Sequence, residues 1–416
     1  MMKRDLVLVG SLFASLLLSN GGHAGTDAGA ASTRAGAAGL DTVPEAAGGA
    51  PTVLPAAAQS ASPADQAATP SSPGRPAAAL ASRPGLPPAV PVWNTLPGEF
   101  AMRTLKGYYL TAIDGGGRNT APIIVTAATQ AGPWEKFRLA VLDPPPPHDK
   151  SIQTASGNYL TAVDGGGRTT DTLHTDATQV RGWEQFRVHD LSEGGVAPTY
   201  FAFQTIGGNY LTAVGEGGQY EDAIHTDAKQ VGRWEYLRVV KCGDLGSGYQ
   251  YTILPTNDQM LEAVNGGGRD RGDTIVQGSS PGDTPDRAWA RFKLLRQHDG
   301  SYALQTVNGT NYVTALGGGG QVQKYLPPNC GFPGACISGF STIFHTDATQ
   351  VRAWERFKFV DQGNCKYAIQ TVSGYYMGIF KDSHGYTLLT TRRSTISENE
   401  KFQLVMYGLA SPVVLH

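Results

Sequence analysis

The sequence predicts an all-β protein built from six similar four-stranded units, and two observations carry this prediction. The first is an internal repeat of about fifty residues, a length typical of folds made from repeated units. The second is the pattern within each copy, where apolar residues alternate with the period of two that strands show and helices do not. In the second copy, Leu160 and Ala162 share one face, as do Phe186 and Val188. We expect the strands of this copy at 151–154, 159–163, 172–175 and 184–189.

The N-terminal residues 1–24 have the pattern of a secretory signal. Lys3 and Arg4 precede an apolar run from Leu6 to Leu18, and small residues follow where cleavage is expected. The apolar run is too short to cross a bilayer comfortably. We therefore expect an exported protein, whether secreted, periplasmic or on the cell surface, with no membrane insertion after the signal is removed.

Residues 25–92 are rich in Ala, Pro, Gly, Ser and Thr, and they contain no Phe, Tyr or Ile. Such a segment cannot bury enough apolar surface to offset the entropy lost on ordering. We expect a disordered linker here, followed by folded structure from Trp93 onward.

The six copies align on one apolar strand position. The fifth copy is longer than the others, and its extra residues lie between Gly320 and His345, which indicates a surface-loop insertion. A cluster of glycines after Lys241 suggests a division into 93–242 and 243–416, with three repeats in each part. The aligned residues are Leu110, Leu160, Leu211, Leu261, Val313 and Met377.

Repeats of this kind fit either two β-trefoils of three units each or one six-bladed propeller. The break after the third copy favours two tandem β-trefoils. Glycine clusters such as Gly165–Gly167, between the second and third strands, are expected to supply positive-φ turns.

The phrase Asn-Tyr-Leu-Thr-Ala at 158–162 and 209–213, the glycine turn after it and a Trp near the end of the unit resemble fascin-like β-trefoil proteins. The resemblance covers roughly 97–407. It implies two fascin-like trefoils here, where fascin carries four, and it suggests filament crosslinking as one possible role.

A Trp-Glu-x-Phe phrase recurs near the end of the units. A catalytic acid needs one tuned environment, so a Glu found in five of six copies is better explained as a hydrogen-bond acceptor in a turn. The Trp residues are likewise interpreted as structural positions of the repeat. They are Trp134, Trp183, Trp234, Trp289 and Trp354.

A His-Thr-Asp phrase recurs in three copies. A metal needs several ligands at one point, whereas these pairs lie on different units. One interpretation is that the Asp forms an Asx-type turn with the His beside it. The alternative is a polar pocket, one per unit, that binds a sugar or another polar ligand. The candidate ligand-binding residues are His174, Asp176, His225, Asp227, His345 and Asp347.

Four cysteines remain in a chain that we expect to be exported, where disulfides persist. Cys330 and Cys336 flank a short loop that a bridge could hold. Cys242 and Cys365 follow the last strands of the third and fifth repeats, and the sequence does not decide whether they pair.

The remaining features exclude several classes of function. A formal net charge of −2, with dispersed basic residues, gives no nucleic-acid surface. No nucleophile elbow, zinc-protease or dinucleotide motif is present. We predict no catalytic residue, cofactor or metal. The expected function is non-enzymatic binding or adhesion, with polysaccharide as the partner; the alternatives are a scaffold that crosslinks surface or filament proteins and a hydrolase with an unrecognised site.

Overall fold

The computed structural model describes the chain from Val92 to Leu409 with internal gaps, and all of these residues belong to one compact unit, Arg83–His416. The predicted signal at 1–24, residues 25–91 of the linker predicted at 25–92, and the Cys330–Cys336 pair lie outside the described residues and stay predictions. The last residue of that linker, Val92, already belongs to a strand, so the linker bound was wrong by one residue. The described ranges are 92–143, 147–191, 199–270, 275–277, 287–329 and 337–409.

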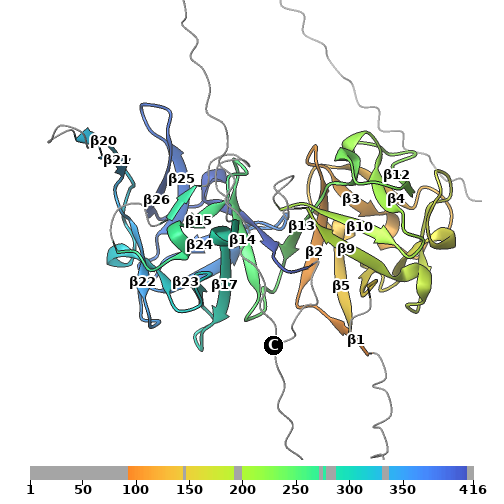
Figure 1. The fold of residues 1–416 in the computed structure, drawn as a ribbon, viewed down its shortest axis with the longest axis horizontal. Helices are drawn as coiled ribbons and strands as arrows, with labels where there is room; N and C mark the ends of the chain where they lie inside the picture. The colour runs from red at the N-terminus through yellow and green to blue at the C-terminus, as the bar shows by residue number, and fades with distance from the viewer. Residues whose placement is uncertain are drawn as a thin grey trace, which may run out of the picture. The chain divides into compact units, whose positions relative to one another are not determined.

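Six strands of the first three repeats close into a barrel (Figure 1). Each strand pairs antiparallel with the next, and the last pairs back with the first, Val239 facing Met102. The short strand β1 (Val92–Thr95) pairs with the outer part of the second barrel strand. The barrel strands are β2 (Glu99–Thr104), β5 (Lys136–Asp143), β6 (Lys150–Gln153), β9 (Phe186–Asp190), β10 (Phe201–Thr205) and β13 (Leu237–Cys242).

Three hairpins, one from each repeat, complete this first barrel. In each hairpin the pairing shifts register at the second residue of the first strand. An irregularity of this kind bends the hairpin. A closed six-stranded barrel with three hairpins is the topology of a β-trefoil, so the predicted fold class is confirmed. The hairpins are β3–β4 (Tyr109–Ala112, Ile124–Ala128), β7–β8 (Tyr159–Ala162, Leu173–Ala177) and β11–β12 (Tyr210–Ala213, Ile224–Ala228).

The last three repeats form a second barrel of the same kind. Its strands pair in order, and the last pairs with the first, Leu404 facing Ile253. They are β14 (Gln250–Pro255), β17 (Arg291–Arg296), β18 (Tyr302–Gln305), β23 (Arg356–Asp361), β24 (Tyr367–Gln370) and β27 (Lys401–Met406). Its hairpins are β15–β16 (Leu261–Ala263, Ile275–Gln277), β19–β22 (Tyr312–Ala315, Phe344–Ala348) and β25–β26 (Tyr376–Lys381, Thr387–Arg393).

The insertion expected in the fifth repeat forms a further hairpin, β20 (Tyr325–Asn329) with β21 (Ile337–Phe340), which extends outward in Figure 1. In the described part of the chain, helices are limited to short 3-10 turns. They are η1 (Ile113–Gly115), η2 (Pro133–Glu135), η3 (Val163–Gly165), η4 (Gly182–Glu184), η5 (Val214–Glu216), η6 (Arg233–Glu235), η7 (Val264–Gly266), η8 (Arg287–Ala290), η9 (Leu316–Gly318) and η10 (Glu398–Glu400).

The second repeat shows how closely sequence pattern and structure agree. Its strands lie within two residues of their expected bounds, except that Glu184 belongs to η4 and not to the strand after it. The aligned apolar position is buried in every copy, as at Leu160, which is 1% exposed.

The glycine turns adopt the positive φ that the sequence predicts. Gly116 has φ 102° and Gly166 has φ 95°. A Cβ atom on Gly166 would also lie 2.4 Å from Oγ1 of Thr205 in the next repeat. Only glycine satisfies both conditions, so these turns set the distance between neighbouring repeats.

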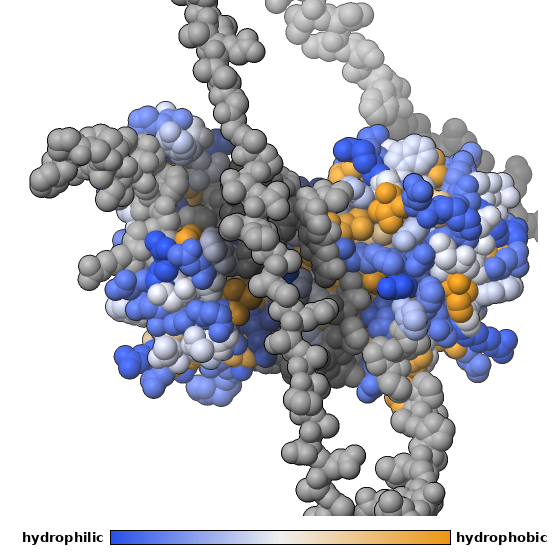
Figure 2. Space-filling view, viewed as in Figure 1, coloured by the Kyte–Doolittle hydropathy of each residue, from blue (hydrophilic) through white to orange (hydrophobic). Residues whose placement is uncertain are grey.

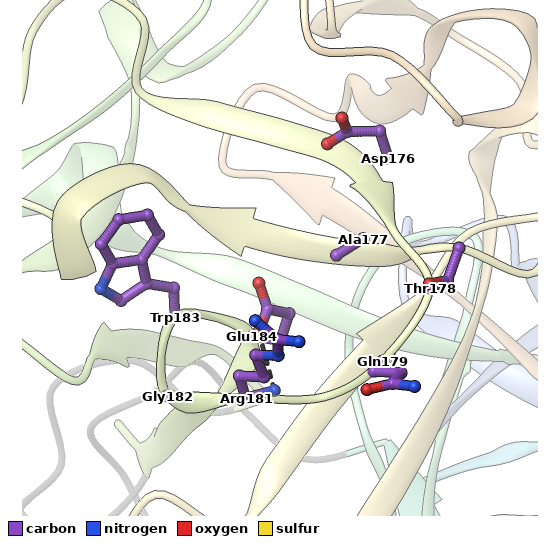
Figure 3. Close-up of a pocket in the computed structure, with 8 residues that line it drawn as sticks. All are labelled: Asp176, Ala177, Thr178, Gln179, Arg181, Gly182, Trp183 and Glu184. Carbon is purple, nitrogen blue, oxygen red and sulfur yellow. Dashed lines mark hydrogen bonds between the residues drawn. The ribbon is translucent and has the colours of Figure 1, made fainter.

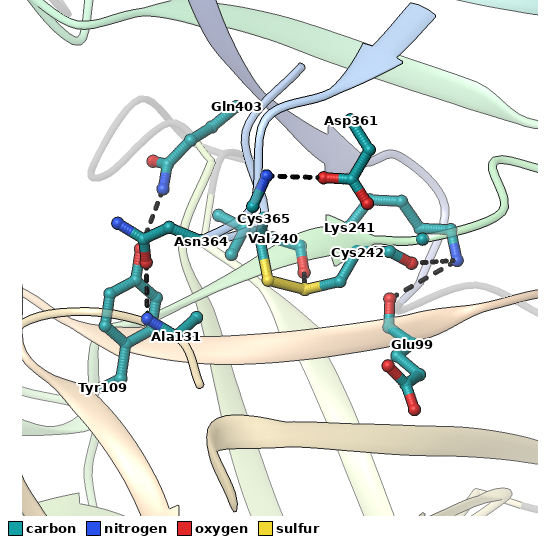
Figure 4. Close-up of a disulfide and its surroundings, with 12 residues drawn as sticks. Glu99, Tyr109, Ala131, Val240, Lys241, Cys242, Asp361, Asn364, Cys365 and Gln403 are labelled. Atoms are coloured by element: carbon teal, nitrogen blue, oxygen red, sulfur yellow. Dashed lines mark hydrogen bonds between the residues drawn. A yellow bond between two sulfur atoms is a disulfide. The ribbon is translucent and has the colours of Figure 1, made fainter. Parts of the chain in front are cut away.

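A disulfide joins Cys242 at the end of β13 to Cys365 in the turn between β23 and β24 (Figure 4). It links the two barrels, and it answers the pairing question that the sequence left open. Two further contacts support it: β13 meets β27 where Val240 faces Val405, and the Tyr367 hydroxyl donates to the Gly243 carbonyl at 2.8 Å.

Lys241, next to this disulfide, is fully buried (Figure 4). Its ammonium nitrogen donates to the carbonyls of Pro97, Glu99 and Cys242 and lies 4.3 Å from the centre of the Phe100 ring. Burial lowers the pKa of Lys241 to about 7.

We expect the free energy of unfolding to rise between pH 7 and pH 10 because of this lysine. In that window the unfolded chain keeps the proton that the folded chain has lost, so the rise approaches about 1.4 kcal/mol per pH unit. Burial also lowers the pKa of Lys150, which adds to the rise. Above pH 10 the trend should reverse, because burial raises the pKa of Tyr251 and Tyr367. Urea unfolding at a series of pH values measures the slope, and Lys241→Met should flatten it; an equal slope in both proteins would contradict the assignment.

Candidate functional site

The structure places the three His-Thr-Asp phrases on three different hairpins. His174 and Asp176 lie on β8, and the equivalent residues of the other copies lie on β12 and β22. In each phrase the Thr is fully buried, as Thr175 is, while the His is partly exposed and the Asp exposed. The six candidate residues therefore do not converge on one point.

The buried Thr of the phrase serves the scaffold. Thr175 N donates to the Arg118 carbonyl at 2.8 Å, and Gly117 N donates to the Thr175 carbonyl at 2.7 Å. Equivalent bonds join Thr226 to the turn at Arg168 and Thr126 to the turn at Gln219, so they link the three hairpins of the first barrel in a ring.

In two of the three copies the His is paired with an Asp outside the phrase. His174 Nε2 lies 2.8 Å from Oδ1 of Asp171, three residues earlier, and His225 is paired in the same way with Asp222. Within the phrases, His225 Nδ1 is 4.0 Å from Asp227 and His345 Nδ1 is 3.8 Å from Asp347. Asp176 instead accepts from Asn119 Nδ2 of the first repeat at 3.0 Å.

A pocket of about 620 Å³ lies beside Asp176. It is lined by residues 176–179 and 181–184, so it follows the loop from the end of β8 to η4. Figure 3 shows the carboxylate of Asp176 and the indole of Trp183 at the two ends of this loop, with Arg181 and Glu184 between them.

Glu184 in this pocket is occupied by the scaffold. Its Oε1 accepts from Thr161 Oγ1 at 2.8 Å and its Oε2 accepts from Arg181 N at 2.7 Å. The expectation that the recurring Glu is a hydrogen-bond acceptor in a turn is confirmed for this copy. The same bond to a strand Thr is made by Glu135, Glu235 and Glu355.

The recurring Trp residues are more exposed than a purely structural role requires. Trp134, Trp183, Trp234 and Trp354 are each 45–47% exposed. Each Trp follows Pro, Gly, Arg or Ala in a polar loop and does not belong to the alternating pattern of a strand. This position in a loop was the sequence signal that could have indicated their exposure.

Two of these indoles have an exposed aliphatic neighbour from the next repeat. Trp183 and Ile206 both border Gly165, and Trp354 and Val372 both border Gly318. Ile206 is 45% exposed and Val372 is 52% exposed. The pair in each case forms a small apolar platform at the surface.

Only some repeats combine the exposed Trp with the exposed Asp. Asp176, Asp227 and Asp347 provide the carboxylate in the second, third and fifth repeats, while Ala127 stands at that position in the first. We call the three combinations the Trp–Asp subsites: Asp176 with Trp183, Asp227 with Trp234, and Asp347 with Trp354.

Charged residues of the glycine turns neutralise one another. Arg118 pairs with Asp114, and Arg168 pairs with Asp164. Among the described residues, no group of three or more His, Cys, Asp or Glu side chains could hold a metal ion, and no described helix is long and apolar enough to cross a membrane. Figure 2 shows a face that is mostly hydrophilic, with hydrophobic residues in small separate spots.

No family model matches the chain, and no curated protein matches it. Similar solved structures include the designed threefold-symmetric protein ThreeFoil, at 13% identity and TM-score 0.28, covering 38% of this chain and 97% of that one. The BEL β-trefoil is similar at 10% identity and TM-score 0.27, covering 39% of this chain and 97% of that one.

A mosquitocidal holotoxin is similar at 7% identity and TM-score 0.29; the match covers 74% of this chain and spans about a third, 34%, of the toxin. Likenesses this weak say nothing about what this chain binds. Membership in the fascin-like family also stays a prediction.

Proposed function

We propose that this is an exported, non-enzymatic protein that binds polysaccharide through its Trp–Asp subsites. The observation that carries the proposal is a half-exposed indole and an exposed carboxylate at the two ends of the same loop, repeated on three units of the scaffold. An indole face packs against the apolar C–H face of a sugar ring. A carboxylate accepts hydrogen bonds from sugar hydroxyls, and such charge-assisted bonds are the stronger kind.

The subsite of the second repeat has the features of a small-ligand site. Its pocket of about 620 Å³ is large enough for a sugar unit. Trp183 provides its apolar side and Asp176 its polar side, and Ile206 lies close by, beside Gly182. Because Glu184 is held by Thr161 and Arg181, we assign it to the scaffold, which favours binding over hydrolysis here.

Several subsites on one molecule suit a polymeric ligand. Each alone would bind weakly, but a polysaccharide that reaches two or three gains affinity by avidity. The Cys242–Cys365 disulfide fits an oxidising compartment and thus an exported protein.

Removing the three indoles tests the proposal. We expect Trp183→Ala/Trp234→Ala/Trp354→Ala to weaken retention on polysaccharide by at least about 100-fold, because avidity is lost with the subsites. Pull-down on a panel of insoluble polysaccharides and a glycan array provide the measurement. Asp176→Asn/Asp227→Asn/Asp347→Asn should also weaken retention while leaving the indoles in place.

Trp134→Ala is the matched control, because Trp134 is equally exposed but its repeat has Ala127 in place of the Asp. It should leave retention close to that of the unmodified protein. No retention on any glycan, or equal retention by the triple Trp variant in its folded form, would refute the proposal. Co-sedimentation with filaments instead would favour the crosslinking scaffold, and turnover in glycosidase or esterase screens would favour the hydrolase.

A further inference from the structure

A second cavity, of about 440 Å³, lies where the three hairpins of the first barrel meet. It is lined by residues 121–124, 169–173 and 220–224, which are equivalent segments of the three repeats just before and at the start of β4, β8 and β12. A cavity lined equally by three related segments lies on their pseudo-threefold axis. We call it the axial pocket, and it does not depend on the Trp–Asp subsites.

The floor of the axial pocket is apolar. It consists of side chains that are at most 8% exposed, among them Ile123, Leu173 and Ile224. A ligand that lies on this floor therefore gains from removing its own apolar surface from water.

The rim of the axial pocket is acidic. Asp171, Glu221 and Asp222 line it, and no Lys or Arg is among the lining residues. The nearest recorded cation, Arg168, is 3.5 Å from Asp171 and is mainly engaged with Asp164. Tyr220, 59% exposed, adds an aromatic ring that can attract a cation.

The first repeat shows that the fold does not need these acids. By strand register, Val125 stands where the other repeats have His174 and His225. Three residues earlier, Pro122 stands where they have Asp171 and Asp222. The Asp–His pair is thus missing as a unit from one repeat, yet Thr126 still closes the hairpin ring. The second and third repeats therefore each give the axial pocket an acidic side, and the first repeat gives it an apolar wall at Pro122.

A histidine holds each of the two Asp carboxylates at the rim of the axial pocket. His174 and His225 each hold Oδ1 of their Asp at 2.8 Å, which restricts the orientation of the carboxylate. The second oxygen of Asp222 has no hydrogen-bond partner among the described residues, so it can accept from a ligand. Two oriented carboxylates above an apolar floor match a positive head group on an apolar body.

We infer that the axial pocket binds a small organic ammonium ion. The apolar body lies on the floor and against the Pro122 wall, and the ammonium group donates to Asp171 and Asp222 with Tyr220 beside it. The same chemistry is offered by a free amine, by an amino sugar and by a lysine side chain.

Benzylamine and its neutral analogue benzyl alcohol test this inference on the full protein. Saturation-transfer NMR and calorimetry should show benzylamine binding about tenfold more tightly than benzyl alcohol, the ratio expected for one charge-assisted bond. Asp171→Asn/Asp222→Asn keeps the shape of both side chains and should abolish that preference. Asp143→Asn, which removes an exposed charge at the end of β5, should retain it.

Equal binding of the two probes, no saturable binding of benzylamine, or an unchanged preference in the double variant would each overturn the inference. Displacement of benzylamine by glucosamine but not by N-acetylglucosamine would support it and identify an amino sugar as the source. Displacement by Nα-acetyl-lysine amide, whose only ammonium group is that of the side chain, would support it and identify a basic side chain.

Discussion

Replacing Cys242 and Cys365 together by serine is expected to lower the free energy of unfolding by about 3–5 kcal/mol. The bridge spans 123 residues of sequence, and a loop of that length restricts the unfolded chain strongly. Guanidinium unfolding of the variant beside the unmodified protein measures the loss, and reduction of the unmodified protein should reproduce it.

The same variant should also separate the two barrels during unfolding. Without the disulfide, the links that remain are the single pairing of Val240 with Val405 and a small set of polar contacts. Among these are contacts that join Tyr367 to Gly243, Gln403 to Tyr109, Arg238 to Asp258 and Asn364 to Ala131. We expect intrinsic fluorescence and circular dichroism to give transitions that no longer coincide.

The Cys330→Ser/Cys336→Ser variant is the control for these experiments. A bridge between those residues would close only a short loop, so its removal should cost less and should not affect coupling of the barrels. A Cys242→Ser/Cys365→Ser variant with unchanged midpoint and coincident transitions would show that the disulfide does not couple them.

The sequence predicts the barrels well because their determinants are local and repeated. Leu160 and its equivalents mark a strand in each copy, and the glycines at 165–167 mark the turn after it. The pairing of Cys242 with Cys365 could not be predicted in this way. It depends on how a strand of one barrel meets a turn of the other, and no repeat encodes that contact.

The candidate site was predictable only in part, for a related reason. The His and Asp of the repeated phrase were identified, but His174 pairs with Asp171, which lies outside the phrase. An Asp stands at that position in the second and third repeats but not in the first and fifth, so the repeat pattern did not reveal it. The exposure of Trp183 was missed because a recurring aromatic residue is usually a core residue. Repetition indicates that a position matters, but it does not tell whether the side chain faces the core or the solvent.

Glu184→Ala is the second change from which we expect a large effect, a loss of about 2–4 kcal/mol in the free energy of unfolding. Glu184 is 5% exposed, and its removal leaves the Thr161 hydroxyl and the Arg181 amide without their acceptor. The Thr161 hydroxyl is buried, and a buried donor left without a partner costs about 1–3 kcal/mol. The part-buried bond to the Arg181 amide adds a smaller loss. Thermal and urea unfolding measure the loss.

The fourth repeat offers a stringent control for this prediction. There Ala290 stands in place of Glu184, and Glu262 stands in place of Thr161. Glu262 is 3% exposed, so a buried acid is kept but comes from strand β15 and not from the 3-10 turn. The exchange leads us to expect that the fold needs one buried carboxylate per repeat here and accepts it from either element.

Adding Thr161→Glu to Glu184→Ala copies the fourth repeat into the second. The double variant should recover part of the lost stability, while Thr161→Glu alone should be destabilising because two buried carboxylates would then share one space. A double-mutant cycle gives the coupling between the positions, which we expect to be favourable by about 1–3 kcal/mol. Simple additivity of the two changes would mean that the acid has no common structural role in the two repeats.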